Sequence, residues 1–584
     1  YKDDGEMIKF DIINNNRCKR CDIVLAEEKD GISIYELVCD FEEETQPKEI
    51  TVLFDIEFGG AFSMWNYSCV QDRRLLSDWR ENLQKTDSRL ACGIPIHSVI
   101  GQNGKNVFTV SISDIKNPLQ ISSGINEKRV RHSCSVRFFT QKTAKVHCYR
   151  TFIRIDRRNI DFYDAISSAM DYLREINNLK QPHIPNGAKN PVFSTWYNFH
   201  QDINEQNLSE QFSAAYDLGM RTIIIDDGWQ TEDDNGGYAF CGDWKVCASK
   251  FPDMKRFVDK AHKAGLKVMM WYSVPFIGRY SDAAKSFKGM FLDAQNRDWC
   301  CLDPRFPKVR DFLMSKYETA VKKWDVDGFK LDFIDEFKLT KYSDDKSSER
   351  DYDSLDDAVE ELLCEISKRL KRINPDILIE FRQNYIGPVM TTYANMLRAG
   401  DCAIDAITNR ISVLDLRMTS GKVPVHSDMV IWDYADAAHI AAKQLCAVML
   451  GVPQISVRLD KLPKEHREML KNYLSFFNKH SDVLLGGKLT LYNPECGYSM
   501  AETENNNKKI TVCYVKNVVT LFKGKHYIVN GTGNTDIYVK SKYEILIRYT
   551  ITDCTGRIID EGERNIKDVS EFNVPESGIL TIRQ

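Results

Sequence analysis

The order of apolar and polar positions changes twice along the chain. Up to about residue 160, short runs alternate between apolar and polar residues, as in 49–58, 106–115 and 144–156, and clusters of Gly, Asn and Asp separate them. This two-residue period is typical of half-buried strands. The region is therefore predicted to be a sandwich of antiparallel sheets.

A helix and a boundary follow this β region. Apolar residues recur at three- and four-residue steps over 161–176, which predicts a helix. The stretch 181–191 is rich in Pro, Gly and Asn and marks the end of the first unit.

From residue 192 the pattern becomes short β-branched runs that alternate with amphipathic segments. One such segment, 253–265, has Asp253 as a predicted N-cap and Gly265 as its C-terminal stop. Eight runs are predicted as strands: 192–198, 221–229, 267–274, 328–333, 377–384, 395–401, 423–428 and 453–459. Strands that alternate with helices predict a (β/α)8 barrel. A doubly wound sheet is the alternative, but we find no glycine-rich phosphate loop to support it.

After 484–494 the alternation of apolar and polar residues typical of strands returns and continues to the end. The expected fold is therefore a multidomain α/β protein, in which a central (β/α)8 TIM barrel is flanked by two β-sandwiches. The expected domains are an N-terminal sandwich with a linker helix (1–180), the barrel (190–485) and a small C-terminal antiparallel β-sandwich (486–584).

Length and charge narrow the class of protein. The 584 residues carry a net charge of -5, which gives no electrostatic case for binding nucleic acid or an anionic membrane. No apolar run reaches the ~18 residues of a membrane span. We therefore expect neither a nucleic-acid partner nor a membrane span.

The 17 cysteines are scattered along the chain. Cys18 and Cys21 form a CxxC pair, but no second pair follows at a zinc-site spacing, so ordinary thiols are favoured over a metal or redox site. Scattered thiols favour a reducing compartment. Tyr1 stands first instead of Met, which is compatible with removal of a signal peptide. A cytoplasmic and a periplasmic or secreted location both stay open.

Polar and aromatic residues gather where the predicted barrel strands end, which is where barrel enzymes place their functional groups. In strand order they are Trp196; Asp226, Asp227 and Trp229; Trp271; Lys330 and Asp332; Arg382 and Asn384; Arg398 and Asp401. Aromatic faces and carboxylates suit a sugar, and no metal motif is present. A rim of structural salt bridges is the alternative.

Two segments carry a family resemblance. The run IIIDDGW at 223–229, with GDWKVCASKFPDMKRFVDKAHKAGLKVMMW at 242–271, resembles the α-galactosidases of glycoside hydrolase family 36 and its relative family 27. The run ending in VDGFKLDFID at 326–335 does so too. The resemblance covers about 192–460, and the sandwich–barrel–sandwich order fits family 36.

The resemblance implies a catalytic pair. Asp332 would be the nucleophile, and Lys330, on the same strand face, would favour its ionised form. Asp401 would be the general acid and base, with Asp405 as the competitor, because the family's Ser-Asp-Asn element is replaced here by LRAGDCAIDAITNR. Retention of configuration would follow from carboxyl groups ~5–5.5 Å apart. Asp335 is expected to order its loop.

The resemblance also implies how the sugar is held. Asp226 and Asp227 would bind the 4- and 6-hydroxyls of galactose, and Trp229 and Trp271 would wall the ring. Where the family has Cys-x-Ser-Gly-Gly, this chain has EFRQNYIGP, so Arg382 and Asn384 would serve the 2-position, and a 2-hydroxyl or a 2-acetamido group both stay open. Trp196 and Arg398 complete the expected substrate-binding set. Arg417, His426 and Trp432 are candidates for an outer subsite or for the core.

The leading hypothesis is a retaining α-galactosidase that hydrolyses terminal α-D-galactosides of an oligosaccharide or glycoside. An α-N-acetylgalactosaminidase, a transglycosylase of the raffinose-synthase type and a catalytically silent carbohydrate-binding protein are the alternatives. A two-carboxylate mechanism needs no metal and no organic cofactor. Family 36 enzymes are often oligomers, so a homo-oligomer is a candidate assembly.

Overall fold

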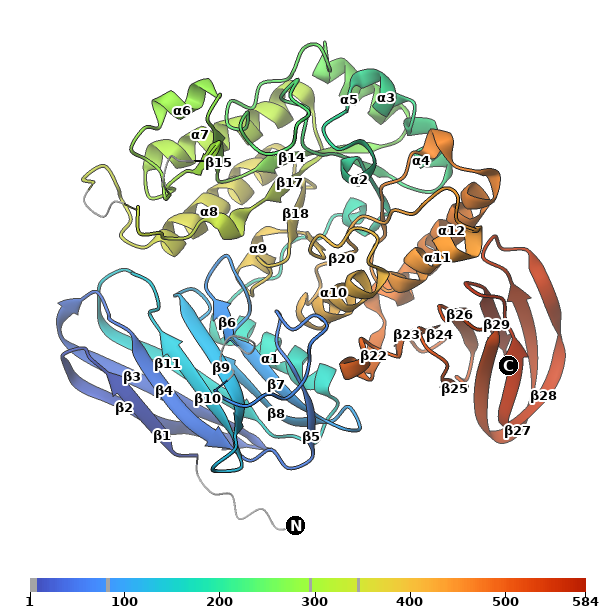
Figure 1. The fold of residues 1–584 in the computed structure, drawn as a ribbon, viewed down its shortest axis with the longest axis horizontal. Coiled ribbons are helices and arrows are strands. Elements are labelled where there is room, and N and C mark those ends of the chain that lie inside the picture. Colours follow the sequence, from blue (N-terminus) through green and yellow to red (C-terminus); the bar gives the residue numbers. More distant parts are fainter. Residues whose placement is uncertain (1–7, 80–84, 294–296, 344–346) are drawn as a thin grey trace.

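The computed structural model describes residues 8–79, 85–293, 297–343 and 347–584. In Figure 1 three regions follow one another along the chain, with the N-terminal strands in blue, a mixed helix and strand region in green to orange, and the C-terminal strands in red. Within these ranges no helix is long and apolar enough to cross a membrane.

The N-terminal region is a two-sheet sandwich, as predicted. A five-stranded sheet has the order β1-β4-β10-β9-β6, and a six-stranded sheet has the order β2-β3-β11-β8-β7-β5. Alternate residues of both sheets, such as Leu37, Val52 and Val110, meet in one buried cluster, which the two-residue period requires. The strands are β1 Phe10–Asn14, β2 Cys18–Lys29, β3 Ile32–Thr45, β4 Ile50–Ile56, β5 Ala61–Trp65, β6 Lys85–Ser88, β7 Ile96–Gly101, β8 Asn106–Ile112, β9 Leu119–Asn126, β10 Arg131–Phe138 and β11 Val146–Asp156.

The central region is the predicted (β/α)8 barrel. Its strands pair in parallel in the order β20-β19-β18-β17-β14-β13-β12-β21. A parallel bridge between His426 and Val452 brings the two ends of this sheet together. Each observed strand lies inside one of the eight predicted ranges: β12 Val192–Ser194, β13 Thr222–Ile225, β14 Lys267–Ser273, β17 Gly328–Asp332, β18 Leu378–Arg382, β19 Met396–Arg398, β20 Val425–His426 and β21 Gln454–Ile455.

Helices surround these strands (Figure 1). The predicted helix at 161–176 is α1 Phe162–Ile176, and Asp253 caps α5 by accepting a hydrogen bond from the Arg256 amide. The others are α2 Trp196–Phe199, α3 Glu205–Ser209, α4 Phe212–Asp217, α5 Met254–Lys263, α6 Asp282–Ser286, α7 Pro307–Thr319, α8 Leu355–Ile373, α9 Met390–Tyr393, α10 Ala406–Thr419, α11 Ala438–Ala447 and α12 Lys464–Gly486. A small hairpin, β15 Phe276–Gly278 and β16 Trp299–Cys301, follows β14.

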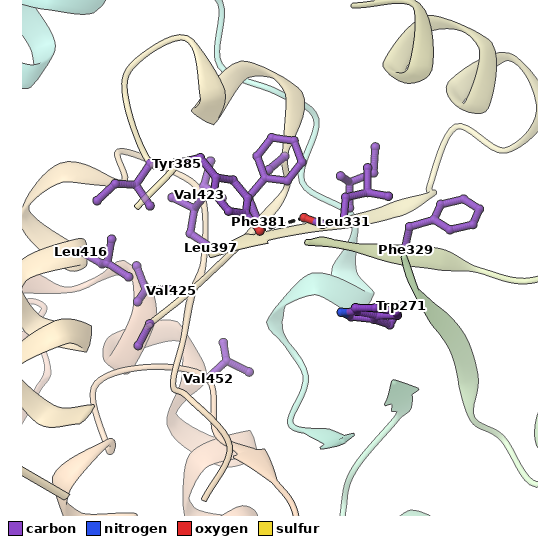
Figure 2. Packing of buried hydrophobic residues seen from close by; sticks show 14 of the residues in the cluster. Trp271, Phe329, Leu331, Phe381, Tyr385, Leu397, Leu416, Val423, Val425 and Val452 are labelled. Atoms are coloured by element: carbon purple, nitrogen blue, oxygen red, sulfur yellow. Dashed lines mark hydrogen bonds between the residues drawn. The ribbon is translucent and has the colours of Figure 1, made fainter. Parts of the chain in front are cut away.

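Strand β17 shows how alternation separates core from site. Figure 2 shows Phe329 and Leu331 within the buried apolar cluster. Side chains alternate across a strand, so Lys330 and Asp332 share the opposite face. The one run therefore supplies packing on one side and two charged groups on the other.

The C-terminal region differs in one respect from the predicted antiparallel sandwich. Its strands join edge to edge into one sheet, in which β24 pairs with β26 and β25 pairs with β27 in parallel. Buried residues from seven of these strands, among them Ile528 and Phe572, form one cluster, so the sheet wraps around its own core. The strands are β22 Lys488–Tyr492, β23 Met500–Glu504, β24 Lys508–Cys513, β25 Val518–Thr520, β26 Lys525–Asn530, β27 Asp536–Thr552, β28 Ile558–Asn573 and β29 Ile579–Arg583.

A loop of the N-terminal sandwich touches the barrel close to the end of β17. Arg89 donates a hydrogen bond to the Asp335 carbonyl at 2.6 Å, and the Gly93 amide donates to the Asn384 carbonyl at 2.9 Å. These contacts fix the loops that follow β17 and β18.

Candidate active site

Asp332 is the last residue of β17, and hydrogen-bond donors surround its carboxylate. Its Oδ1 accepts from Arg382 Nε at 2.6 Å and from the Phe333 amide at 2.8 Å, and its Oδ2 accepts from Trp271 Nε1 at 2.9 Å. Burial alone would raise the pKa of Asp332, but Arg382, Lys330 and the other donors outweigh it and hold that pKa well below its usual range. The carboxylate is therefore ionised and firmly oriented.

Lys330 lies on the same strand face, but its direct partner is Asp226. Lys330 Nζ donates to Asp226 Oδ2 at 2.7 Å, and both side chains are buried, at 5% and 3% exposure. Burial lowers the pKa of Lys330, yet Asp226 and the neighbouring carboxylates raise it above its usual value. Lys330 thus stabilises two acids, Asp226 by contact and Asp332 through space.

Asp227 sits beside this pair between two glutamines. Gln201 Nε2 donates to its Oδ2 at 2.7 Å and Gln230 Nε2 donates to its Oδ1 at 2.6 Å. Burial, only partly offset by these bonds, raises the pKa of Asp227 to about 6. Neither glutamine could be singled out from the sequence, since both lie in loops without a periodic pattern.

Arg398 is fully buried at the end of β19 and binds several carboxylates. It pairs with Asp428, lies 2.9 Å from Asp401 Oδ1 and lies 3.6 Å from Glu380 Oε1. Arg398 has no exposed surface here and its observed partners are carboxylates, so a direct contact with substrate stays a prediction. Arg398 is a positioning residue for Asp401. Glu380 was missed because an isolated acid within a strand carries no pattern.

Asp401 and its competitor Asp405 are both exposed, but they have different partners. Its side chain is 60% exposed, and Arg398 and Lys330 overcome the effect of partial desolvation and lower its pKa below the usual value. Asp405 is the N-cap of α10 and accepts from the Ile407 and Thr408 amides. The cap commits Asp405 to the helix.

The two tryptophans expected to wall a sugar ring have different positions. Trp271 lies at the site, and Tyr238, which the sequence did not single out, stacks on it with centroids 6.1 Å apart. Trp229 is fully buried, stacks on Trp244 and donates its Nε1 hydrogen to the Trp271 carbonyl at 3.0 Å. In this structure Trp229 supports Trp271 from behind, and its predicted role as a wall of the sugar ring stays a prediction.

The remaining predicted residues are spread more widely. Trp196 begins α2, is half-buried and stacks on His200 at 4.8 Å. Asn384 is exposed at the contact with the N-terminal sandwich. The three outer-subsite candidates have partners within the protein. His426 and Trp432 are buried, where His426 meets the Ala188 carbonyl and Trp432 donates to His466, and Arg417 is half-buried and donates to the Leu450 and Leu484 carbonyls.

One group of three potential metal ligands occurs among the described residues. It consists of Asp259, His262 and Asp325 and lies away from Asp332, at α5 and the loop before β17. Lys255 Nζ already pairs with Asp259 and lies 3.7 Å from Asp325. The group is therefore balanced by a lysine and is separate from the acids at the strand ends.

Comparisons with known proteins identify the family of the chain. The melibiase family model matches residues 169–487. Alpha-galactosidase 1 of Pediococcus pentosaceus is 27% identical over 150 residues, which cover 24% of this chain and 20% of that protein. Alpha-galactosidase AgaA of Geobacillus stearothermophilus is 25% identical over 118 residues, which cover 20% of this chain and 15% of that protein. The matched segments thus span a fifth or less of these curated relatives.

Solved structures share the fold over almost the whole chain. The family 36 α-galactosidase AgaA of Geobacillus stearothermophilus has a TM-score of 0.62 at 14% identity and covers 98% of this chain and 87% of its own. The α-galactosidase of Lactobacillus brevis has a TM-score of 0.63 at 14% identity and covers 99% of this chain and 85% of its own.

Proposed function

The chain belongs to the melibiase family, and from this premise we propose that it is an α-galactosidase that removes terminal α-D-galactose with retention of configuration. The observation that carries the proposal is the state of Asp332. An acid at the carboxyl end of a barrel strand, ionised and oriented by Arg382 and Trp271, has the properties of a nucleophile.

In the first step Asp332 attacks the anomeric carbon while protonated Asp401 donates its proton to the leaving glycosidic oxygen. The bond from carbon to that oxygen breaks, and a covalent glycosyl ester with Asp332 forms. In the second step Asp401 removes a proton from water, which attacks the same carbon and releases Asp332. Two inversions leave the configuration unchanged.

Asp226, Asp227 and Lys330 form the proposed hydroxyl-binding group. Buried carboxylates that already face a cation or amide donors can accept further hydrogen bonds from sugar hydroxyls. Tyr238 is half-buried and would supply aromatic surface for the apolar face of the ring, while Trp271, on which Tyr238 stacks, is only 2% exposed and stays a proposed contact behind it. Trp196, Arg382 and Asn384 stay proposed contacts around this group, with Arg382 at the 2-position.

The test is hydrolysis of 4-nitrophenyl α-D-galactopyranoside by the wild type and by Asp332→Asn. Cleavage by the wild type and loss in the variant are expected, whereas Asp325→Asn, a matched change in the exposed loop before the same strand, retains activity. The 2-acetamido substrate is assayed in parallel. If only that glycoside is cleaved, the chain is an α-N-acetylgalactosaminidase, and if neither is cleaved the hydrolase proposal fails.

A further inference from the structure

Two thiols of the N-terminal sandwich face each other across neighbouring strands. β2 and β3 pair with Cys21 directly opposite Cys39, and the two Sγ atoms lie 3.0 Å apart. Directly opposed residues in such a pair have Cβ atoms ~4.5–5.5 Å apart, close to the ~3.5–4.5 Å that a disulfide spans. A small adjustment of side chains is enough to bring the two sulfurs into bonding range.

A β-bulge determines which cysteine meets Cys39. Cys18 lies opposite Phe41 and Arg20 lies opposite Asp40, so Lys19 is an extra residue in β2. Without it, residues three apart on a strand would point to opposite faces. With it, Cys18 and Cys21 both pack against the core of the sandwich.

The bulge therefore gathers a thiol cluster, Cys18, Cys21 and Cys39, on the inner face of the six-stranded sheet. Cys18 accepts a hydrogen bond from Asn14 Nδ2 at 3.2 Å, and it is the neighbour of Cys21 along the same face of β2. Cys21 is half-buried and Cys39 is fully buried. A reagent from solution therefore meets Cys21 before Cys39.

We propose that Cys21 and Cys39 are a modification site, which small disulfides such as glutathione disulfide convert into a cross-strand disulfide. The Cys21 thiolate attacks one sulfur of the oxidant, whose S–S bond breaks and releases a thiolate. Cys39 then loses its proton and attacks the Cys21 sulfur of the mixed disulfide, which releases the second thiolate. The two protein thiols lose two electrons and two protons, and the oxidant is reduced to two thiols.

The electrostatics support this order of attack. The hydrogen bond from Cys39 lowers the pKa of Cys21 to about 7, although burial opposes the shift. The same contact, together with burial, raises the pKa of Cys39 well above its usual value. Cys21 therefore supplies the reactive thiolate, and Cys39 resolves the mixed disulfide.

A zinc site is the competing interpretation of this cluster. Zinc would need four ligands at ~2.0–2.3 Å, so their donor atoms would lie within 4 Å or so of one another. Among the described residues, the only group of three donors from His, Cys, Asp or Glu within 4.8 Å of one another is that of Asp259, His262 and Asp325. The third sulfur of the thiol cluster is therefore too distant for a formed metal site.

The disulfide would link the edge strand β2 of the six-stranded sheet to its neighbour β3. β2 ends the six-stranded sheet and pairs only with β3 within it. Cross-linking residues 18 positions apart would fix the register of this edge strand. The expected readout is an upward shift in the thermal midpoint of the oxidised protein, which disappears on reduction.

The experiment is disulfide mapping of the full chain after exposure to glutathione disulfide. Remaining thiols are alkylated, the chain is digested without reduction, and the peptides are identified by mass spectrometry. We expect two fewer free thiols than the 17 of the reduced chain and a peptide that joins Cys21 to Cys39. Cys39→Ser should instead hold glutathione on Cys21, because the resolving thiol is absent.

Cys148→Ser is the matched control. Cys148 is exposed on β11, opposite Asp40, and its removal should leave the linked peptide unchanged. A Cys18–Cys21 linkage in the wild type, full recovery of unmodified Cys21, or one bound zinc per chain that protects these thiols would each overturn the proposal. The mapping of the wild type decides the matter even where Cys39→Ser fails to fold.

Discussion

Lys330→Met tests the buried charge pair of the site. The change keeps a long side chain but removes the cation that lies 2.7 Å from Asp226. At this distance, and with an effective dielectric of ~20, the gross attraction is about 6 kcal/mol. Much of it offsets desolvation, and loss of one partner of a buried pair costs ~3–5 kcal/mol because the other charge stays buried alone.

The assay is urea unfolding followed by fluorescence, with hydrolysis measured on the same samples. Lys322→Met is the control, because Lys322 pairs with Glu318 on the surface at 57% and 25% exposure. Such an exposed pair contributes at most ~1 kcal/mol. The control should therefore leave both stability and activity nearly unchanged.

The double variant Lys330→Met, Asp226→Asn separates stability from function. Removal of both charges should recover most of the lost stability, because no unpaired buried charge remains. Activity should stay lost, because Asp226 is a proposed acceptor for sugar hydroxyls. The reasoning is refuted if Lys330→Met costs less than ~1 kcal/mol, or if the double variant is no more stable than the single one.

Three further predictions concern the catalytic acids. Trp271→Phe removes a hydrogen bond to ionised Asp332, which is worth ~1.5–3 kcal/mol, and leaves a cavity, so kcat should fall ~10- to 100-fold and the free energy of unfolding should fall as well; an unchanged kcat would show that Trp271 does not orient the nucleophile. Asp405→Ala should cost ~1 kcal/mol of stability by uncapping α10 and leave kcat intact. Asp401→Ala should abolish activity and leave the α10 cap in place, and loss of activity in Asp405→Ala would exchange the two assignments. Because Arg398 lowers the pKa of Asp401, its protonated form is scarce in the free protein at neutral pH, so kcat/KM should rise as the pH falls toward that pKa; a profile that rises with pH would contradict Asp401 as the acid.

The barrel could be predicted from the sequence because its strands are short β-branched runs between amphipathic helices. The same reasoning located Lys330 and Asp332, since side-chain alternation puts residues two apart on one face. In the C-terminal sheet, alternation identified strands but could not give their direction. The parallel pairing of β24 with β26 depends on how the chain returns to the sheet.

The site was harder to predict wherever the chain turns. Gly228 has a φ of +112°, and a Cβ there would lie 2.7 Å from the Gln201 Cα. The residue after it, Trp229, is buried behind Trp271, which the strand pattern could not show. Arg398 looked like a ligand residue because it ends a strand, but its partners come from other strands and loops that only the fold brings together.

The central claim is that Asp332 forms a covalent bond to the sugar. Asp332→Ala should be inactive toward 4-nitrophenyl α-D-galactopyranoside, and added azide should restore release of nitrophenol by taking the place of the missing carboxylate. The account predicts β-galactosyl azide as the product, since a single displacement inverts the configuration. An Asp332→Ala variant that retains hydrolysis, or a rescued reaction that gives α-galactosyl azide, would contradict it.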